Sequence, residues 1–230
     1  MHDDSLWNGI KGVVLDAVGT LIEPVPSVAH VYANMAARQG VVLDLKEIRG
    51  RFGRHFRDDE TNESRGPMIT DETIERARWR RIVGNVLPEV PEPSRAFEEL
   101  WEHFGRAEAW RCYPDVAPAL KLMLDAGLHV RIGSNFDCRL RTVVAGLPEL
   151  SPLAEGLIIS SEVGFRKPHP GFYEATCRNL GLPATEILFL GDDPENDVDG
   201  PKRAGLRSAL IDREGKKSGG FMTILDLIHV

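Results

Sequence analysis

Short apolar runs alternate with helical repeats through the second half of the chain. The runs that are short enough to be buried strands cover residues 12–15, 128–132, 157–159, 187–190 and 208–211. Helical spacing predicts helices over residues 120–126, 172–180, 196–204 and 221–229. A further helix is predicted to follow the strand that ends near residue 135 and to continue to about residue 145. Strands that alternate with helices predict an α/β fold with a doubly wound parallel sheet.

The segment of residues 22–112 has a different pattern, which is helical almost throughout and contains no strand pattern. Four helices are predicted in it. The first covers residues 27–39, and the second has Leu45, Ile48, Phe52 and Phe56 on one face. The third is capped by Thr70 and buries Ile74, Ile82 and Val86, and the fourth carries Phe97, Leu100, Trp101 and Phe104. We therefore predict a core formed by residues 1–21 and 113–230, and a small α-helical cap domain formed by residues 22–112.

Composition narrows the class of protein. The 230 residues are 42% hydrophobic and 27% charged, as in a soluble globular protein. The formal net charge of −7 disfavours nucleic acid as a partner, because nucleic-acid binders are usually basic. If an anionic ligand binds, local groups or a metal must overcome this negative field.

Neither export nor metal–thiolate chemistry is indicated. The first nine residues lack the apolar core of a signal peptide, and no run approaches the roughly 20 apolar residues of a membrane span. The expected location is the cytoplasm, with no membrane partner. Cys112, Cys138 and Cys177 are odd in number and widely spaced, so they predict neither a disulfide framework nor a zinc site.

Polar residues follow three of the predicted strands. They are Asp16, the pair Ser134-Asn135 and the pair Asp192-Asp193. Each alone has an ordinary explanation as a turn or a helix cap. Because ligands of open parallel sheets bind beyond the carboxyl ends of the strands, their joint occurrence predicts a functional site there. The chain has no GxxxxGK[ST] or GxGxxG phosphate loop, and an EF-hand started at Glu195 would have Leu206 where a bidentate Glu is needed.

Four segments in order resemble the motifs of the haloacid dehalogenase-like (HAD) hydrolase superfamily. They are VVLDAVGTL, which contains Asp16, then IGSN with Ser134, then Lys167-Pro168, and finally LFLGDDPEND, which runs to Asp197. The predicted cap lies between the first and second motifs, as in the subfamily that contains haloacid dehalogenases and many phosphatases. The resemblance implies a hydrolase that acts on a small molecule, working as a monomer or homodimer.

The resemblance also implies a site for Mg²⁺, an ion that prefers oxygen ligands. Asp16, Asp192 and the carbonyl of Val18 would be its direct ligands. Asp193 and Asp197 would hold waters or orient the loop.

The remaining roles concern a phosphorylated substrate. Asp16 would attack phosphorus and form an aspartyl-phosphate intermediate. Lys167 would neutralise charge between nucleophile and phosphoryl group, while Ser134 and the backbone N–H of Asn135 would bind a phosphoryl oxygen. Thr20 is placed with the substrate-binding residues, in a role that supports the loop.

One residue departs from the phosphatase pattern. HAD phosphatases typically carry an acid–base Asp two residues after the nucleophile, and here that position is Val18. A metal-dependent phosphatase that acts without this Asp is our first interpretation. A relative of the L-2-haloacid dehalogenases is the second, since Ser134-Asn135 and the spacing from Lys167 to Tyr173 match that group. The acidic pair Asp192-Asp193 counts against the second, because it would repel an anionic substrate if no metal were bound.

Two further readings stay open. Phosphonatases have a small apolar residue at the Val18 position and a cap lysine, but Lys46 is the only lysine of the predicted cap and reads as solvent-exposed. A non-catalytic HAD-fold binding module would explain Val18 but not the retention of Asp16 and Lys167. We also expect at least one cap arginine to reach the site and recognise an anionic group, from the set Arg49, Arg51, Arg54 and Arg57.

Overall fold

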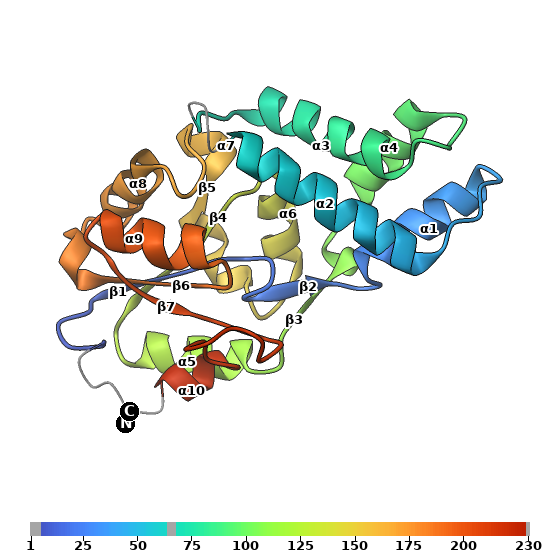
Figure 1. Ribbon diagram of the computed structural model, residues 1–230. Coiled ribbons are helices and arrows are strands. Elements are labelled where there is room, and N and C mark those ends of the chain that lie inside the picture. The colour runs from blue at the N-terminus through green and yellow to red at the C-terminus, as the bar shows by residue number, and fades with distance from the viewer. Residues whose placement is uncertain (1–5, 64–67, 229–230) are drawn as a thin grey trace.

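The computed structural model describes residues 6–63 and 68–228 and has a parallel sheet of five strands at its centre (Figure 1). In sheet order the strands are β5 (Leu157–Ile159), β4 (His129–Ser134), β1 (Gly12–Leu15), β6 (Ile187–Gly191) and β7 (Arg207–Leu210). All four strand pairings are parallel. The predicted α/β class is confirmed, and each predicted strand lies within two residues of an observed one.

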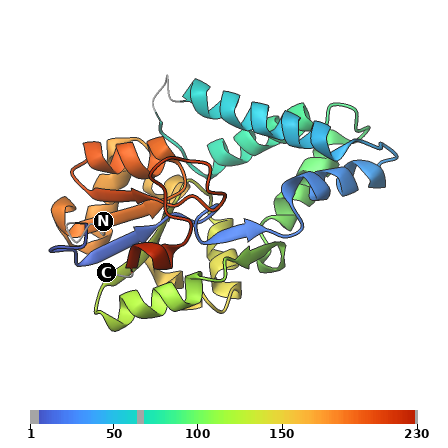
Figure 2. The ribbon, with the colours of Figure 1, turned by 60° about the horizontal axis from the view of Figure 1, so that its bottom comes forward.

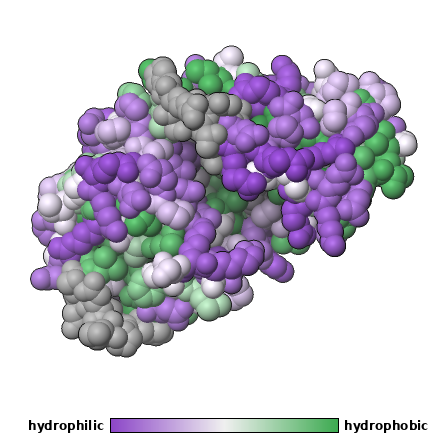
Figure 3. Space-filling view, viewed as in Figure 1, coloured by the Kyte–Doolittle hydropathy of each residue, from purple (hydrophilic) through white to green (hydrophobic). Residues whose placement is uncertain are grey.

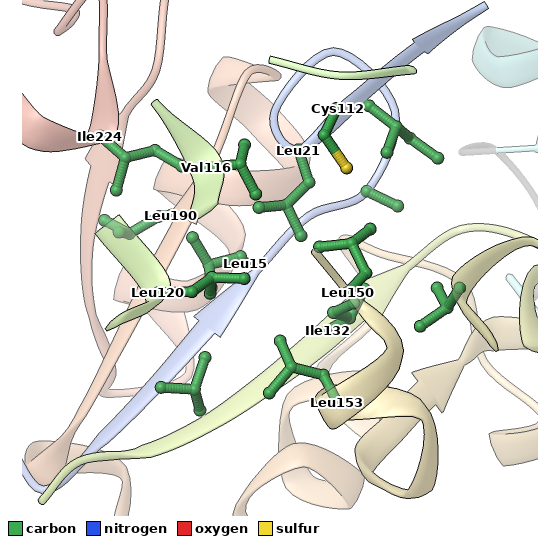
Figure 4. Packing of buried hydrophobic residues seen from close by; sticks show 14 of the residues in the cluster. Leu15, Leu21, Cys112, Val116, Leu120, Ile132, Leu150, Leu153, Leu190 and Ile224 are labelled. Carbon is green, nitrogen blue, oxygen red and sulfur yellow. The ribbon is translucent and has the colours of Figure 1, made fainter. Parts of the chain in front are cut away.

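Helices cover both faces of the sheet. One face packs against α5 (Val116–Asp125), α6 (Arg139–Gly146) and α10 (Ile224–Ile228), and the other against α8 (Pro170–Leu180), with α9 (Gly200–Arg203) beside it. Leu15 and Leu190 point into the first of these layers (Figure 4). Because both faces are covered, β1 and β6 are apolar throughout, whereas β4 contains Arg131 and β7 begins with Arg207.

Short elements complete the core. They are α7 (Ser160–Val163), the 3₁₀ turns η1 (Ala107–Ala109), η2 (Ser151–Gly156) and η3 (Ala184–Glu186), and the π-helical η4 (Pro194–Asp199). The helix predicted over residues 196–204 is confirmed, although it begins at Pro194 and is π-helical over η4 before it becomes α-helical in α9. Asp193 caps η4, and the hydroxyl of Tyr173 donates a hydrogen bond to the Asn196 carbonyl within it.

The segment between β1 and β4 forms the helical insert, defined here as α1 (Val28–Arg38), α2 (Leu45–Glu63), α3 (Glu72–Val86) and α4 (Pro93–His103). Figure 2 shows it extending from one side of the core. Its buried apolar residues form a cluster separate from those around the sheet, with Tyr32, Met35, Ile48, Ile82, Phe97 and Leu100 among its members.

Two strands at the ends of this segment were not predicted. β2 (Ile22–Pro24) and β3 (Trp110–Cys112) pair antiparallel and connect the insert to the core. Each has three residues, which is too short to produce a recognisable alternation.

A second attachment joins the start of α3 to the core. The N–H of Arg166 donates to the Met68 carbonyl at 2.9 Å, and that of Thr70 to the Gly164 carbonyl at 3.1 Å. The Glu72 carboxylate accepts from the hydroxyl of Ser161 at 2.5 Å. The insert is thus held at two separate places along the core.

The α3 prediction was wrong in its cap and in part of its buried face. The Asp71 side chain, not that of Thr70, accepts from the Ile74 N–H, and Ile74 is 42% exposed. The buried face carries Glu75 and Arg78 beside Ile82 and Val86. Counting apolar positions cannot detect a helix face that buries an ion pair.

Some predictions fall at or beyond the limits of the described chain. The terminal helix, predicted over residues 221–229, begins at Ile224, and His229 lies outside the described residues, as do residues 1–5 and 64–67 of the predicted domains. Within residues 6–63 and 68–228, no helix combines the length and hydrophobicity that a membrane span requires.

Candidate active site

The polar groups at the three strand ends meet at one edge of the sheet. The register aligns Leu15 of β1 with Ile132 of β4 and with Leu190 of β6, so the residues after these strands are neighbours. Ser134 donates from its hydroxyl to Asp16 Oδ1 at 3.0 Å. Both side chains are nearly buried, which makes this a shielded site.

Lys167 is a buried cation in this cluster. Its Nζ donates to Asp16 Oδ1 at 2.7 Å, to Asp197 Oδ1 at 2.6 Å and to the Gly133 carbonyl at 3.1 Å. Burial alone would lower the pKa of Lys167, but Asp16 and Asp197 outweigh it and raise the pKa above the usual range. The ammonium therefore stays charged and holds the two carboxylates together.

The side chain of Asn135 holds the backbone of Lys167 in place. Its side-chain Nδ2 donates to the Lys167 carbonyl at 3.0 Å, and its Oδ1 accepts from the Lys167 N–H at 2.7 Å. These two bonds fix the Lys167 backbone from the end of β4. Asn135 also lines the pocket, where its backbone N–H is the group predicted to meet substrate.

Three carboxylates face one another beside the lysine. Asp16, Asp192 and Asp197 each place an oxygen within 4.8 Å of the other two. The Asp192 side chain is 37% exposed, yet burial of its carboxylate and the charges of Asp16 and Asp197 raise its pKa to about 7. Burial also raises the pKa of Asp197 to about 6, against the opposing effect of Lys167. Such a crowded set of oxygen donors fits a divalent cation such as Mg²⁺.

Asp193 orients this acidic loop. Its carboxylate accepts from the N–H groups of Glu195 at 3.0 Å and Asn196 at 2.8 Å, and its own N–H donates to Asp197 Oδ2 at 3.0 Å. The Asp193 side chain is occupied by these bonds at the start of η4, so its part is to shape the loop.

Two glycines allow the acidic groups to approach. Gly19 has φ +88°, and a Cβ there would lie 2.7 Å from the Asp192 carboxylate. A Cβ on Gly191 would lie 2.2 Å from Cγ of Asp197. Larger residues at these positions would push Asp192 or Asp197 away from the nucleophile.

Thr20 is not where the substrate-binding prediction placed it. It is fully buried and is not among the described residues that line the pocket. Its carbonyl accepts from the guanidinium of Arg213, which also pairs with Asp115 at 2.7 Å. The residue anchors the nucleophile loop from behind, and no local pattern reveals a partner 193 residues away.

A pocket of about 380 Å³ lies between this polar floor and the helical insert. Figure 3 shows hydrophobic side chains in a hollow between the hydrophilic surfaces of the two parts. Val18 lines the pocket near the floor and is 36% exposed. The aromatic residues of the wall are Tyr32, Phe52, Phe56, Trp79, Phe97, Trp101, Phe104, Trp110 and Phe136.

The arginine prediction for the insert was wrong in its choice of residues. The described lining contains none of Arg49, Arg51, Arg54 and Arg57. Arg51 instead pairs with Glu47 at 2.7 Å and Glu89 at 2.6 Å, and it donates to the Val86 carbonyl at 3.2 Å, so it packs against the end of α3.

Arg78, Arg139 and Arg166 line the pocket in their place. Buried Glu75 joins two of them, at 2.5 Å from Arg166 and 3.7 Å from Arg78. Sequence reasoning missed this group. The available signal was a pair of opposite charges three positions apart, Glu75 and Arg78, on a helix face that is otherwise apolar.

Two residues on which the phosphonatase and dehalogenase interpretations depend are not among the described residues that line the pocket. Lys46, which the phosphonatase reading needs, is exposed on α2. Tyr173, which matched the dehalogenase spacing, is buried and bonded to the Asn196 carbonyl.

Comparison with known proteins gives matches in sequence and in structure. A family profile described as haloacid dehalogenase-like hydrolase matches residues 10–205. A protein named as a phosphatase in Mycobacterium tuberculosis is 28% identical over 93% of this chain and 92% of its own. A phosphoserine phosphatase of Thermus thermophilus is 25% identical over 89% of each chain. A crystal structure titled as a dehalogenase with an intermediate complex matches 95% of this chain and 96% of its own, with a TM-score of 0.75 and 17% identity.

Proposed function

The chain belongs to the haloacid dehalogenase-like hydrolase family, and from this premise we propose that it is a Mg²⁺-dependent phosphatase acting on a small phosphorylated molecule. The observation that carries the proposal is the acidic cluster. Asp16, Asp192 and Asp197 converge around a single pocket floor, which suits a phosphoryl group only when cations offset the charge. Helices α1 to α4 would act as the cap of the pocket.

Asp16 would be the nucleophile. Its Oδ1 accepts the bonds from Ser134 and Lys167, which leaves Oδ2 to attack phosphorus. The Lys167 ammonium neutralises charge that builds up beside Asp16. Ser134 and the Asn135 N–H would hold a phosphoryl oxygen, and Asn135 in turn positions Lys167.

Asp16, Asp192 and the Val18 carbonyl would hold the metal, with Asp197 and Asp193 supporting the site. When bound, Mg²⁺ supplies positive charge that offsets the repulsion between a carboxylate nucleophile and a phosphoryl group. The raised pKa values of Asp192 and Asp197 support this assignment, because they reflect burial of the two carboxylates beside negative charge that Lys167 does not offset.

We expect the assay that tests the proposal to show release of 4-nitrophenolate from 4-nitrophenyl phosphate only with Mg²⁺. This leaving group needs little protonation, so Val18 does not block the reaction. L-2-chloropropionate without metal serves as the parallel substrate. Chloride release without metal, and no nitrophenolate with it, would contradict the proposal.

The dehalogenase reading is the second candidate. Val18 favours it, because displacement of a halide needs no proton donor. The solved dehalogenase supports only the common fold, since its identity to this chain is 17%. The acidic loop around Asp192 weighs against it, because a carboxylate substrate would meet three carboxylates on the pocket floor.

The same carboxylates predict a pH-dependent stability. Folding raises the pKa of Asp192 from its ordinary 3.8 to about 7. The folded state then binds more protons than the unfolded state, so this contribution to stability is lost as pH rises from about 4 to about 7. We expect Mg²⁺ to raise Tm by several degrees more at pH 8 than at pH 5, since about 1 kcal/mol corresponds to ~2–4 °C for a chain of this size.

Calorimetry of the wild type and Asp192→Asn, with and without Mg²⁺, checks this expectation. The variant lacks the titrating carboxyl, so its response to Mg²⁺ should be smaller and depend less on pH. An equal Mg²⁺ effect at pH 5 and pH 8, or an unchanged response in the variant, would show that Asp192 does not take part in metal binding.

A further inference from the structure

We propose that the leaving group of the substrate is an aromatic alcohol, so that the pocket takes aryl phosphate monoesters. This inference rests on the proposed phosphatase function. Two independent features of the pocket carry it, the aromatic wall above the floor and the apolar side chain of Val18 two residues after the nucleophile.

Three rings of the wall, those of Phe52, Phe56 and Trp79, are only partly buried and lie against one another. Phe52 stacks on Phe56 with centroids 5.7 Å apart, and Trp79 lies 6.4 Å from Phe52 and 6.0 Å from Phe56. These rings come from α2 and α3, across the pocket from Asp16. A planar ring can add to this stack by offset or edge contacts, which an aliphatic chain cannot make.

The second feature is the chemistry available to the departing oxygen. Val18 stands where an acid would protonate it, and the described ionisable residues that line the pocket from the insert are Tyr32 and Arg78. Burial raises the pKa of Tyr32, and a guanidinium does not give up its proton. On the side of the pocket that the insert forms, a leaving group therefore departs as an anion. A phenol, with a pKa of about 10 like that of tyrosine, does so far more readily than an alkanol, whose pKa is closer to the 15.7 of water.

Guanidinium groups set among the rings suit that anion. Arg78 lies over the ring of Phe56 at 5.1 Å, and Arg139 over Trp101 at 3.4 Å and over Phe136 at 5.7 Å. Arg78 and Arg139 are paired with Glu75 and Asp137, so they would act on the leaving group by contact with the face of its ring, as they contact the rings of the wall.

The reaction balances with water as the only other reactant. Asp16 Oδ2 forms a bond to phosphorus, the bond from phosphorus to the aryl oxygen breaks, and its electron pair leaves on the phenolate. Water then attacks phosphorus and restores the Asp16 carboxylate. One proton of that water goes through solvent to the phenolate, which gives the phenol and inorganic phosphate.

The test compares 2-naphthyl phosphate with acetyl phosphate, which has a good leaving group and no ring, in wild type, Asp16→Asn, Trp79→Ala and Ile74→Ala. We expect Trp79→Ala to raise KM for naphthyl phosphate at least about 10-fold more than KM for acetyl phosphate. Ile74 is the matched control, because it is 42% exposed on the same helix and does not line the pocket.

A measurement on the wild type alone keeps the test independent of folding of the variants. We expect phenylphosphonate to inhibit at least about 10-fold more tightly than methylphosphonate. If Asp16-dependent hydrolysis of acetyl phosphate occurs but the two phosphonates inhibit equally, the aryl inference is overturned and the phosphatase proposal stands. If neither ester is hydrolysed in an Asp16-dependent way, the phosphatase proposal fails and the inference fails with it.

Discussion

Asp16→Asn is expected to lower kcat by about 10⁴-fold or more, because an amide cannot replace a carboxylate as nucleophile. The substitution keeps the shape of the side chain, and Oδ1 remains an acceptor for Ser134 and Lys167. Steady-state turnover of 4-nitrophenyl phosphate measures the effect. Rapid acid quenching should also recover a phosphorylated protein from the wild type during turnover and none from the variant.

Asp125→Asn is the matched control, because Asp125 forms an exposed ion pair with Lys121 far from the sheet edge. Its kcat should stay within about 2-fold of the wild type, as expected for a surface charge. The unfolding temperature of each variant separates a loss of chemistry from a loss of fold. Near-normal activity of folded Asp16→Asn would show that another residue attacks the substrate.

Val18→Asp should increase kcat/KM for an alkyl phosphate such as butyl phosphate by about 10²–10⁴-fold, which is the usual contribution of a general acid. Val18 lines the pocket and is 36% exposed, so a carboxyl group there has room to reach the departing oxygen. Activity toward 4-nitrophenyl phosphate should change by less than about 10-fold, because nitrophenolate leaves without a proton. The ratio of the two rates is the quantity to measure.

Val18→Asn provides the control, since it has the shape and polarity of Asp but supplies no acidic proton. An equal gain in Val18→Asn and Val18→Asp would mean that polarity, not proton transfer, had been missing. If neither variant gains activity toward butyl phosphate, then recognition of the substrate by the insert, and not the missing acid, limits kcat/KM.

The sheet edge illustrates what the sequence can predict. Asp16, Ser134 and Asp192 were expected to meet because parallel strands end at the same edge, and the hydrogen bond from Ser134 to Asp16 shows that two of them are in contact. Lys167 required the motif resemblance, since it lies in a loop. Its contact with Asp197 links positions 30 residues apart that no periodic pattern relates.

The insert illustrates what the sequence leaves open. Four arginines on α2 suggested an anion site by their density, but Arg51 is turned toward Glu47, Glu89 and the end of α3 and not toward the pocket. Arg78 lies inside because Glu75 accompanies it, and Arg166 reaches Glu75 from 91 positions away. Side chains that are buried as charged groups are invisible to a search for apolar faces, since it treats every charge as exposed.

The two attachments of the insert restrict how the pocket can open. β2 and β3 hold one edge, and the bonds around Met68, Thr70 and Glu72 hold another. Lifting the insert away from the core would break one of these two sets of bonds, whereas a rotation about the line that joins them would keep both. We therefore expect the pocket to open by a limited rotation of α1 to α4, and loss of the Glu72 contact to permit a wider one.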